Sequence, residues 1–350
     1  MAFIAGDGIG PEVAWASRRC AEATGVAFGW EECAAGEGAR ARGGAALPPA
    51  ALEILGRCGL VLKAPLEGGG GVEANPNGAL ERLFGVHASI RHCRSFSLAG
   101  HAAPGLDLLF IRQVPGSADM PREQETGDPA AMALRAGSRE VGVVYPFSPE
   151  RARAFFQFAF ATAARRGRRR VTVAHQASRY RLTDGAWLAV AAEVAREYPG
   201  LEWEDQLAGH VAMQMVRNPA RFDVVLAAGP SADILGDVAV GLAGGLGMVP
   251  EALCGVRGTI YTAVHGTAPK YAGLNRANPV AMILTGALLL RSVGEDRAAG
   301  AIESGVGVAL AAGPGTPDMT AGAPFRGTAD LADAVIAGIQ GSLGRLQPRA

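Results

Sequence analysis

Two aspartates, Asp233 and Asp237, lie four residues apart in a segment with helical spacing. Residues i and i+4 share one face of a helix, so these two carboxylates could hold a hard divalent cation together. A structural role fits the same spacing, with one aspartate capping the helix and both facing solvent. The pair therefore indicates metal-assisted chemistry as one function of this chain. This interpretation requires that the segment is helical.

The second chemical signal is the scarcity of lysine. Only Lys63 and Lys270 are lysines among the 33 basic residues, which leaves 33 − 2 = 31 arginines. Because this chain uses arginine for nearly every cation, a lysine that remains in a motif indicates a function. The alternative, an ordinary surface lysine, is correspondingly weakened.

Composition excludes several classes of protein. The 33 basic residues cancel 33 acidic ones, whereas binders of nucleic acids and membrane surfaces need a net basic face. Five arginines fall within residues 165–170, which would favour nucleic acid, but the dipole at a helix C-terminus also attracts cations. The five cysteines form no CxxC pair and no signal peptide is visible, so we expect a cytoplasmic protein without disulfides or a zinc site.

The elements that must position these residues alternate along the chain. Strands are predicted at 3–5, 60–63, 106–112, 171–175 and 222–227, and helices after Pro11 and Pro149, from Thr183 to about Tyr198, and over 233–243. This alternation predicts an α/β fold with a largely parallel sheet, and 350 residues suggest two lobes. Pro11 occupies the third glycine position of GxGxxG, so the sequence does not support a standard Rossmann fingerprint.

Six segments, in order along the chain, resemble motifs of the isocitrate/isopropylmalate dehydrogenase family, the β-decarboxylating dehydrogenases. They are Gly6-Asp7-Gly8-Ile9-Gly10-Pro11-Glu12, Leu62-Lys63-Ala64-Pro65, Leu182-Thr183-Asp184-Gly185, Asp233-Ile234-Leu235-Gly236-Asp237, His265-Gly266-Thr267-Ala268-Pro269-Lys270-Tyr271-Ala272-Gly273 with Asn278-Pro279, and Thr316-Pro317-Asp318. Any one match would be weak, but six in the family's order are a strong signal.

The resemblance implies a fold, an assembly and a reaction. It implies a discontinuous cofactor-binding lobe, 1–98 plus 252–350, with a non-Rossmann cofactor site, and a central lobe, 99–251, that carries the interface of a homodimer. Active sites then lie between the lobes and borrow residues from the partner subunit. The family's reaction oxidises a 2-hydroxy acid with NAD(P) and a divalent metal and then removes the β-carboxylate.

The resemblance also assigns residues. Asp233 and Asp237 would bind Mg²⁺ or Mn²⁺, and the guanidinium groups of Arg91 and Arg112 would clamp substrate carboxylates. The expected cofactor-binding residues are His265, Gly266, Ala268, Lys270, Tyr271 and Asn278. A Lys-Tyr pair after HGTAP is typical of NADP rather than NAD, so Lys270 and Tyr271 are expected at the 2′-phosphate and Asn278 at the adenine.

Several catalytic positions depart from the family's pattern. Glu81 occupies the position of the first clamp arginine, and Asn75 that of a serine. Gln176 replaces the catalytic lysine and has no titratable proton, and Gly209 replaces the aspartate that the partner gives to the metal. The tyrosine that acts as an acid falls in a reworked stretch near Asp119, which could itself be an acid or base.

A replacement for the lost groups is available in the sequence. His210, next to Gly209, could act as a base or a metal ligand, although a single histidine in a helix is more often a surface or packed residue. His175 is predicted to point to the opposite strand face from Gln176, and His87 is a weaker candidate for a substrate contact.

Two functions from different classes follow. The first is an NAD(P)-dependent oxidoreductase that acts on a non-standard 2-hydroxy acid, with or without decarboxylation, with Gln176 at the position of the lost base. The alternative is a non-catalytic or regulatory homologue that keeps the fold and, in one version, nucleotide binding. Both predict a small carboxylate ligand and a homodimer, with no nucleic-acid or membrane partner.

Overall fold

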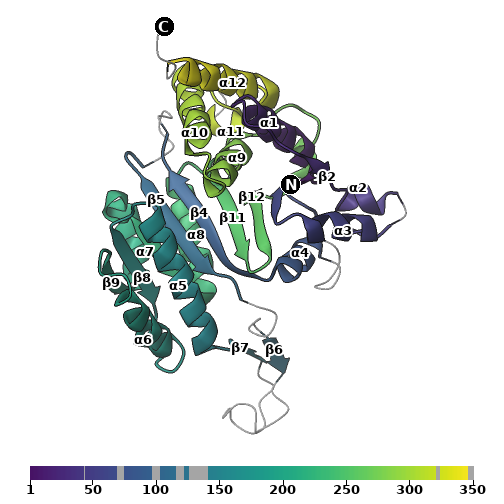
Figure 1. Cartoon of the computed structure of the whole chain (residues 1–350). Helices are drawn as coiled ribbons and strands as arrows, with labels where there is room; N and C mark the ends of the chain where they lie inside the picture. The colour runs from purple at the N-terminus through teal and green to yellow at the C-terminus, as the bar shows by residue number, and fades with distance from the viewer. Residues whose placement is uncertain are drawn as a thin grey trace.

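The computed structural model of the chain describes residues 1–42, 44–68, 75–96, 103–115, 122–125, 141–320 and 324–345. Its centre is a ten-stranded sheet with the order β2-β1-β3-β12-β11-β4-β5-β10-β8-β9 (Figure 1). The strands are β1 (Ala2–Ile4), β2 (Glu31–Glu32), β3 (Leu60–Lys63), β4 (Val86–Arg94), β5 (Asp107–Gln113), β8 (Arg170–His175), β9 (Glu202–Leu207), β10 (Val224–Ala227), β11 (Pro250–Gly255) and β12 (Gly258–Ala263). A separate antiparallel pair joins β6 (Arg122–Glu125) to β7 (Val141–Val144).

The sheet is mostly parallel, as the alternation of elements predicts. Its middle differs, because β4 runs antiparallel to both β5 and β11, and β11 runs antiparallel to β12. The hairpin between β11 and β12 turns at residues 256–257, where Gly258 has φ +144° and a Cβ would lie 2.2 Å from the Gly59 carbonyl oxygen. This hairpin was not predicted from the sequence.

Helices cover both faces of the sheet. The helices are α1 (Gly10–Glu22), α2 (Glu37–Arg40), α3 (Pro49–Arg57), α4 (Pro76–Phe84), α5 (Pro149–Arg165), α6 (Asp184–Ala195), α7 (Ala208–Arg217), α8 (Gly229–Leu242), α9 (Val280–Ser292), α10 (Asp296–Ala311), α11 (Pro317–Thr320) and α12 (Thr328–Arg345), with short 3₁₀ turns at Pro219–Arg221, Leu246–Met248 and Pro269–Tyr271. Side chains of β10 alternate between the faces. Val225 packs in the core with α7 and α8, and Val224 packs in the core with α5 and α6 (Figure 1).

The start of α5 shows how closely the sequence specifies a helix. The Ser148 hydroxyl accepts a hydrogen bond from the Arg151 N–H, and Pro149 occupies the first turn, where its missing donor costs nothing. Phe155, Phe156 and Phe160 are fully buried against the sheet, so the predicted helix is confirmed.

The two ends of the sheet come from different parts of the chain. Strands β1, β2, β3, β11 and β12 form one end, and β5, β8, β9 and β10 form the other, with β4 between them (Figure 1). This order is compatible with the predicted division into 1–98 plus 252–350 and 99–251, which stays a prediction.

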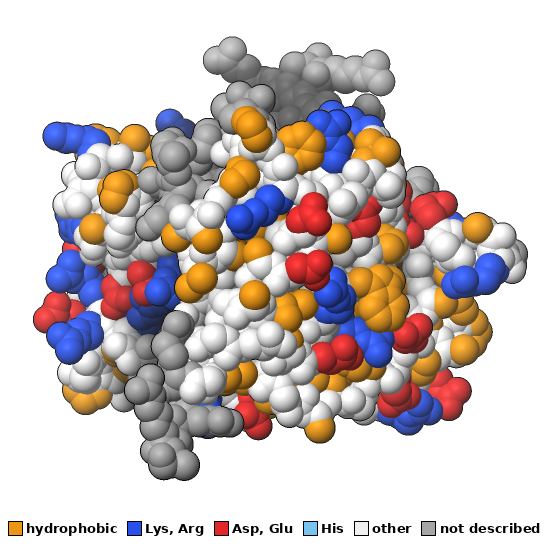
Figure 2. Space-filling view, turned by 90° about the horizontal axis from the view of Figure 1, so that it is seen from above, with side chains coloured by type: hydrophobic (Ala, Val, Ile, Leu, Met, Phe, Trp, Pro, Cys, Tyr) orange, Lys and Arg blue, Asp and Glu red, His pale blue; other side chains and the backbone are white. Residues whose placement is uncertain are grey.

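Two surface properties bear on function. No helix among the described residues is long and apolar enough to cross a membrane, and the most apolar segment, residues 280–290 of α9, is buried throughout. The face drawn in Figure 2 carries basic and acidic side chains interspersed with apolar ones. That mixture agrees with the balanced charge of the sequence.

Candidate active site

The carboxyl edge of the parallel strands brings together the first predicted pair. Arg112, near the end of β5, lies opposite Ala227, the last residue of β10, and α8 begins at Gly229 directly afterwards. Arg112 Nη1 consequently donates to Asp233 Oδ1 at 2.5 Å. Ligands of open α/β sheets bind at this edge, so the contact lies where a site is expected.

Arg91 on β4 forms the second predicted pair. Its guanidinium is buried; Nε donates to Glu251 Oε1 at 2.9 Å and Nη1 to Asp237 Oδ1 at 3.2 Å. The Ser89 hydroxyl donates to the same Glu251 oxygen at 2.6 Å. Burial opposes the ionisation of Glu251, yet Arg91 and Arg112 together hold its pKa below the ordinary value. Glu251 is a site residue that the sequence analysis missed, because no motif marks it.

Glu81 on α4 brings an acid to the same place. Burial raises its pKa, and the positive charges of Arg112 and Lys63 oppose that shift, while Glu251 reinforces it. Within the described part of the chain Arg112 forms its salt bridge with Asp233 and not with Glu81. The Arg112 Nε atom is buried without a hydrogen-bond partner, so this guanidinium keeps an unused donor.

Asn75 has a structural role at the start of α4, the helix that carries Glu81. Its side-chain oxygen accepts a hydrogen bond from the Asn77 N–H at 3.0 Å and caps α4, whose first residue is Pro76. The Asn77 side chain in turn accepts from Lys63 Nζ at 3.1 Å and donates to the Leu66 carbonyl.

Lys63 lies between the arginine and acid cluster described above and the predicted cofactor loop, residues 265–273. The side chain is buried, and burial lowers its pKa from 10.5 to about 8 against the opposing charges of Glu251, Glu81 and Asp7. The charge of Lys63 also contributes to lowering the pKa of His265 in the predicted cofactor loop. In the sequence Lys63 stands out by the rarity of lysine, which was the available signal but assigns it no role.

The metal prediction fits this structure incompletely. Asp233 and Asp237 lie on one helix, as predicted, and their side chains are 68% and 71% exposed. Each contacts an arginine, and the described residues contain no group of three or more acidic, histidine or cysteine side chains placed to hold a metal. Two carboxylates are fewer ligands than Mg²⁺ or Mn²⁺ usually takes from its surroundings.

The remaining catalytic candidates lie at the ends of β8 and β9. The Gln176 N–H donates to Asp184 Oδ2 at 2.5 Å, which fixes the turn that follows β8. His210 is exposed on α7, and within the described residues no hydrogen bond or salt bridge joins it or Gln176 to Arg91 or Arg112. Asp119 lies outside the described residues.

Two other histidines pack among neighbouring side chains, and one of them, His87, has its Nδ1 buried without a hydrogen-bond partner. His175 is buried, with Nε2 3.1 Å from Asp205 Oδ2 and Nδ1 accepting from the Ala177 N–H. His87 packs edge-on against Phe158, and burial lowers its pKa.

The opening glycine motif holds the cofactor loop in place. The Ile9 N–H donates to the Thr267 carbonyl at 2.8 Å, and Glu12 Oε1 accepts from the Gly273 N–H at 2.5 Å. Asp7 joins the neighbouring loops, since its carboxylate accepts from the N–H groups of Glu37 and Glu67. The first and fifth of the six motifs are therefore in direct contact.

The loop itself presents free polar groups. Lys270 and Tyr271 are exposed, with Lys270 Nζ 4.9 Å from the Tyr271 ring centroid. His265 Nδ1 lies 3.0 Å from the Gly266 carbonyl, whereas its Nε2 is buried without a partner. Ala268 has φ +38°, a conformation that costs energy and often marks a functional loop. An orphaned buried nitrogen beside exposed polar side chains fits a bound nucleotide.

Asn278 contributes differently from the prediction. The side chain is buried; its Nδ2 donates to Asp318 Oδ2 at 3.0 Å and its Oδ1 accepts from the Val280 N–H. Asp318 also accepts from the Thr316 hydroxyl at 2.6 Å. Asn278 thus fixes the fifth motif against the sixth, and its proposed contact with adenine stays a prediction.

Comparisons with known proteins cover most of the chain. The family model described as isocitrate/isopropylmalate dehydrogenase matches residues 1–335. The isocitrate/homoisocitrate dehydrogenase of Thermus thermophilus is 32% identical over 332 residues, which cover 91% of this chain and 93% of that protein. The 3-isopropylmalate dehydrogenase of Archaeoglobus fulgidus is 34% identical over 319 residues, covering 91% and 94%. The crystal structure of isocitrate dehydrogenase from Methylococcus capsulatus superposes with a TM-score of 0.86 at 32% identity, covering 97% of this chain and 98% of that one.

Proposed function

The chain belongs to the isocitrate/isopropylmalate dehydrogenase family of β-decarboxylating dehydrogenases, and from that premise we propose that it oxidises a non-standard 2-hydroxy acid with NADP. Loss of the β-carboxylate would follow the oxidation if the enolate can still be stabilised. The proposal concerns the substrate, the cofactor and the surviving chemistry, since the family alone leaves these open.

One observation carries the choice of substrate, namely the position of Glu81 beside Arg112 and Lys63. A carboxylate in the wall of a carboxylate-binding site repels a further anionic group of the ligand. Arg91 and Arg112 would hold one carboxylate of the substrate, and the group near Glu81 would be neutral or a hydrogen-bond donor. A tricarboxylate such as isocitrate fits this arrangement poorly.

The cofactor would be held by the loop that follows β12. Lys270 supplies a cation for a 2′-phosphate and Tyr271 a hydroxyl, while His265 Nε2 offers an acceptor to the base. Burial lowers the pKa of His265 and keeps the imidazole neutral, as an acceptor must be. When bound, NADP supplies the hydride acceptor for oxidation of the alcohol.

A second copy of the chain would complete the site. Met213, Val216 and Ile234, on the adjacent helices α7 and α8, are 43%, 66% and 65% exposed, which is typical of a surface covered by a partner. We propose a homodimer through this face that brings His210 of the second copy towards Asp233 and Asp237. His210 would then act as the base or as a nitrogen ligand for a weakened Mg²⁺ or Mn²⁺ site.

The experiment is a screen of 2-hydroxy mono-, di- and tricarboxylates with NADP⁺ and Mn²⁺, followed by the absorbance of NADPH. We expect turnover with a substrate that has fewer carboxylates than isocitrate. Glu81→Arg is expected to shift preference towards the tricarboxylate. Turnover of isocitrate as the best substrate of the wild-type protein would refute the role of Glu81.

The base is tested separately. His210→Ala is expected to lower kcat with little change in KM, while Arg217→Gln, at the exposed end of the same helix, is expected to behave as wild type. Equal kinetics of His210→Ala and wild type would remove His210 from the reaction.

A non-catalytic homologue is the second candidate, and the absence of a proton acceptor at Gln176 favours it. That protein would bind NADP⁺, detectable as a thermal shift, yet give no turnover with any hydroxy acid of the screen. Activity gained by the double variant Gln176→Lys, Gly209→Asp would show that only those groups are missing. No thermal shift with NADP⁺ or NAD⁺ would refute the assignment of the cofactor.

A further inference from the structure

The arginines of the candidate site stand on one face of the sheet. Arg112 lies opposite Ser89 in the pairing of β5 with β4, and Arg91 lies opposite Glu251 in the pairing of β4 with β11. Directly paired residues, and residues two apart on one strand, have their side chains on the same face of a sheet. The hydrogen bond from the Ser89 hydroxyl to Glu251 agrees with this placement.

Two helices cover this face on either side of Arg112. On one side Leu80 and Phe84 of α4 pack in one core cluster with Leu253 of β11 and with Val114, which lies two residues after Arg112. On the other side α8 brings the two aspartates that pair with the arginines. Arg112 therefore lies between α4 and α8, and a ligand that reaches it also meets α4.

Glu81 is the acid that α4 brings to this place. It follows Asn77 by one helical turn, so the two side chains share a face of the helix, and Asn77 accepts from Lys63 Nζ at 3.1 Å. Glu81 consequently faces the sheet, and the charges of Arg112 and Lys63 both act on it. Among the residues that the structure describes, none forms a hydrogen bond or a salt bridge with the Glu81 carboxylate.

Arg112 has the complementary unpaired group. Its Nη1 donates to Asp233, whereas its Nε is buried without a hydrogen-bond partner. A donor on the strand and an acceptor on the helix thus lie near each other without contact. Each of them costs free energy while it is buried or partly buried and unpaired.

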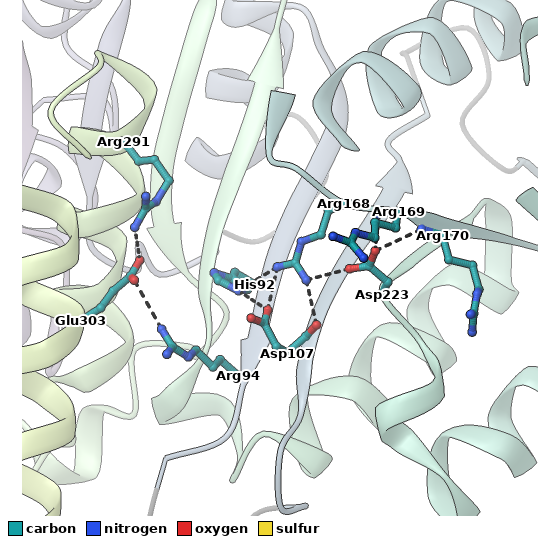
Figure 3. Close-up of polar contacts among 9 residues, drawn as sticks. All are labelled: His92, Arg94, Asp107, Arg168, Arg169, Arg170, Asp223, Arg291 and Glu303. Atoms are coloured by element: carbon teal, nitrogen blue, oxygen red, sulfur yellow. Dashed lines mark hydrogen bonds and ion pairs between the residues drawn. The ribbon is translucent and has the colours of Figure 1, made fainter. Parts of the chain in front are cut away.

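The opposite edge of the same strands shows the contrasting arrangement (Figure 3). There Arg168 donates to Asp107 at 2.6 Å and to Asp223 at 2.9 Å, and Glu303 accepts from the arginines of β4 and α9. Those guanidinium groups meet acids of the protein itself. The unpaired groups of Arg112 and Glu81 lie instead at the carboxyl edge, where open α/β sheets bind their ligands.

The charges at this edge disfavour a second anionic group near Glu81. Arg91 and Arg112 already contact three acids, and Glu81 adds a fourth. Lys63 is a further cation, and its amine donates to Asn77. A carboxylate placed beside Glu81 would be repelled by it, whereas a neutral group would not.

We propose that the substrate carries a primary carboxamide, in addition to the carboxylate that the arginines hold, and that this amide bridges Glu81 and Arg112. Its N–H would donate to the Glu81 carboxylate, and its carbonyl oxygen would accept from Arg112 Nε. A guanidinium has five N–H donors, so Arg112 can serve the amide through Nε and the carboxylate through Nη2. The inference rests on the proposed function, because it names the substrate class of the same site.

The test is calorimetric titration of the full-length protein with Mn²⁺ and NADPH, which allows binding of a hydroxy acid without its oxidation. The ligands are 2-hydroxyglutarate, its 5-amide, 2-hydroxypentanoate and 5-amino-2-hydroxypentanoate, together with malate and its 4-amide as a shorter pair. We expect one of the two amides to bind about tenfold or more tightly than its carboxylate, which Glu81 repels. We expect a similar advantage of the 5-amide over 2-hydroxypentanoate, which leaves both protein groups unpaired.

Three results would overturn the proposal. They are equal or tighter binding of the carboxylates, tightest binding of the amino compound, which would make Glu81 a partner for a cation, and no binding of either amide at millimolar concentration.

Variants locate the preference at Glu81. Glu81→Gln can donate to a carboxylate, so the preference for the amide over the carboxylate is expected to fall by about tenfold. Glu53→Gln removes the same charge from the exposed surface of α3, where Glu53 pairs with Arg57, and is expected to keep the wild-type preference. An unchanged preference in Glu81→Gln would refute the assignment. Thermal unfolding without ligand verifies that both variants are folded.

Turnover of the same compounds with NADP⁺ separates this inference from the proposed reaction. An amide that binds tightly and is not oxidised would support the inference and refute the reaction. Oxidation of a carboxylate, with no preference for its amide in binding or in kcat/KM, would support the reaction and refute the inference.

Discussion

The cofactor loop and the substrate end of the candidate site use their polar groups in opposite ways. In the loop, Glu12 and Asn278 bond to backbone and to Asp318, which leaves Lys270, Tyr271 and His265 Nε2 free to meet a ligand. At the substrate end the arginines are already occupied, Arg91 by Glu251 and Asp237, and Arg112 by Asp233.

The difference shows which half is prepared for its ligand. A nucleotide would meet unpaired polar groups on a loop that Glu12 and Asn278 already fix, so few side chains have to move when it binds. A carboxylate substrate would have to compete with the protein's own acids for the same guanidinium groups. Selectivity at the substrate end therefore depends on what Glu81, Asp233 and Asp237 repel as well as on what the arginines attract.

The largest effect is expected from Glu251, which balances the buried arginine of the substrate end. Glu251→Ala leaves Arg91, 7% exposed, without its buried partner and is expected to lower the free energy of unfolding by about 3–5 kcal/mol. Chemical denaturation measures this. Glu193→Ala removes one of the two exposed acids that pair with Arg153 and is the control, with an expected cost below about 1 kcal/mol. Equal costs for the two variants would show that the Arg91 pair is not structural.

The prediction for the cofactor loop concerns selectivity rather than stability. Lys270→Gln is expected to weaken NADP⁺ binding by about tenfold to a hundredfold, because a charge-assisted contact to phosphate is lost, and to leave NAD⁺ binding within about twofold. Isothermal titration with both nucleotides measures the ratio. Arg276→Gln removes another exposed cation of the same loop and is expected to leave the ratio unchanged. An equal loss for both nucleotides would argue against a 2′-phosphate contact.

Lys63, which joins the two halves, is expected to make stability depend on pH. Its pKa falls from 10.5 to about 8 on folding, so between these values the unfolded chain binds more protons than the folded one. Stability relative to Lys63→Met should therefore rise with pH across this window, by up to about 1.4 kcal/mol per pH unit. Below pH 8 the amine is buried in its charged form, and the full cost of that burial lowers the free energy of unfolding of the wild-type protein. If the free energies of unfolding of wild type and Lys63→Met changed equally with pH, the predicted cost of burying the amine would be wrong.

Prediction from the sequence succeeded where the pattern is local. Pro149 after Ser148 marks the start of α5, alternating residues mark β8, and a continuous apolar run marks β10, each within about two residues of the structure. The antiparallel pairing of β4 with β11 was missed because these two strands are distant in sequence. Pairing over such distances leaves no periodic signal in either strand.

The same limit applies to the site. Motifs pointed to Asp233, Asp237, Arg91 and Arg112, and the structure brings them together as two salt bridges. Glu251 belongs to the same cluster through its position opposite Arg91 on β11, which only the sheet register reveals. Asn75, in contrast, was interpreted as an altered substrate contact, whereas its side chain caps α4. A motif alignment cannot separate a ligand contact from a cap when both occur at the same loop.

The smallest expected effect decides between those two roles of Asn75. If Asn75 only caps α4, Asn75→Ala should lower the free energy of unfolding by about 1 kcal/mol, and Asn75→Ser, another good cap, should recover most of that loss. Neither variant should alter the substrate preference found in the hydroxy-acid screen, because the Asn75 oxygen already accepts from the Asn77 N–H. A change in KM for one substrate, at unchanged stability, would instead show that Asn75 contacts the substrate. The substrate end would then include Asn75 in addition to the arginines and Glu81.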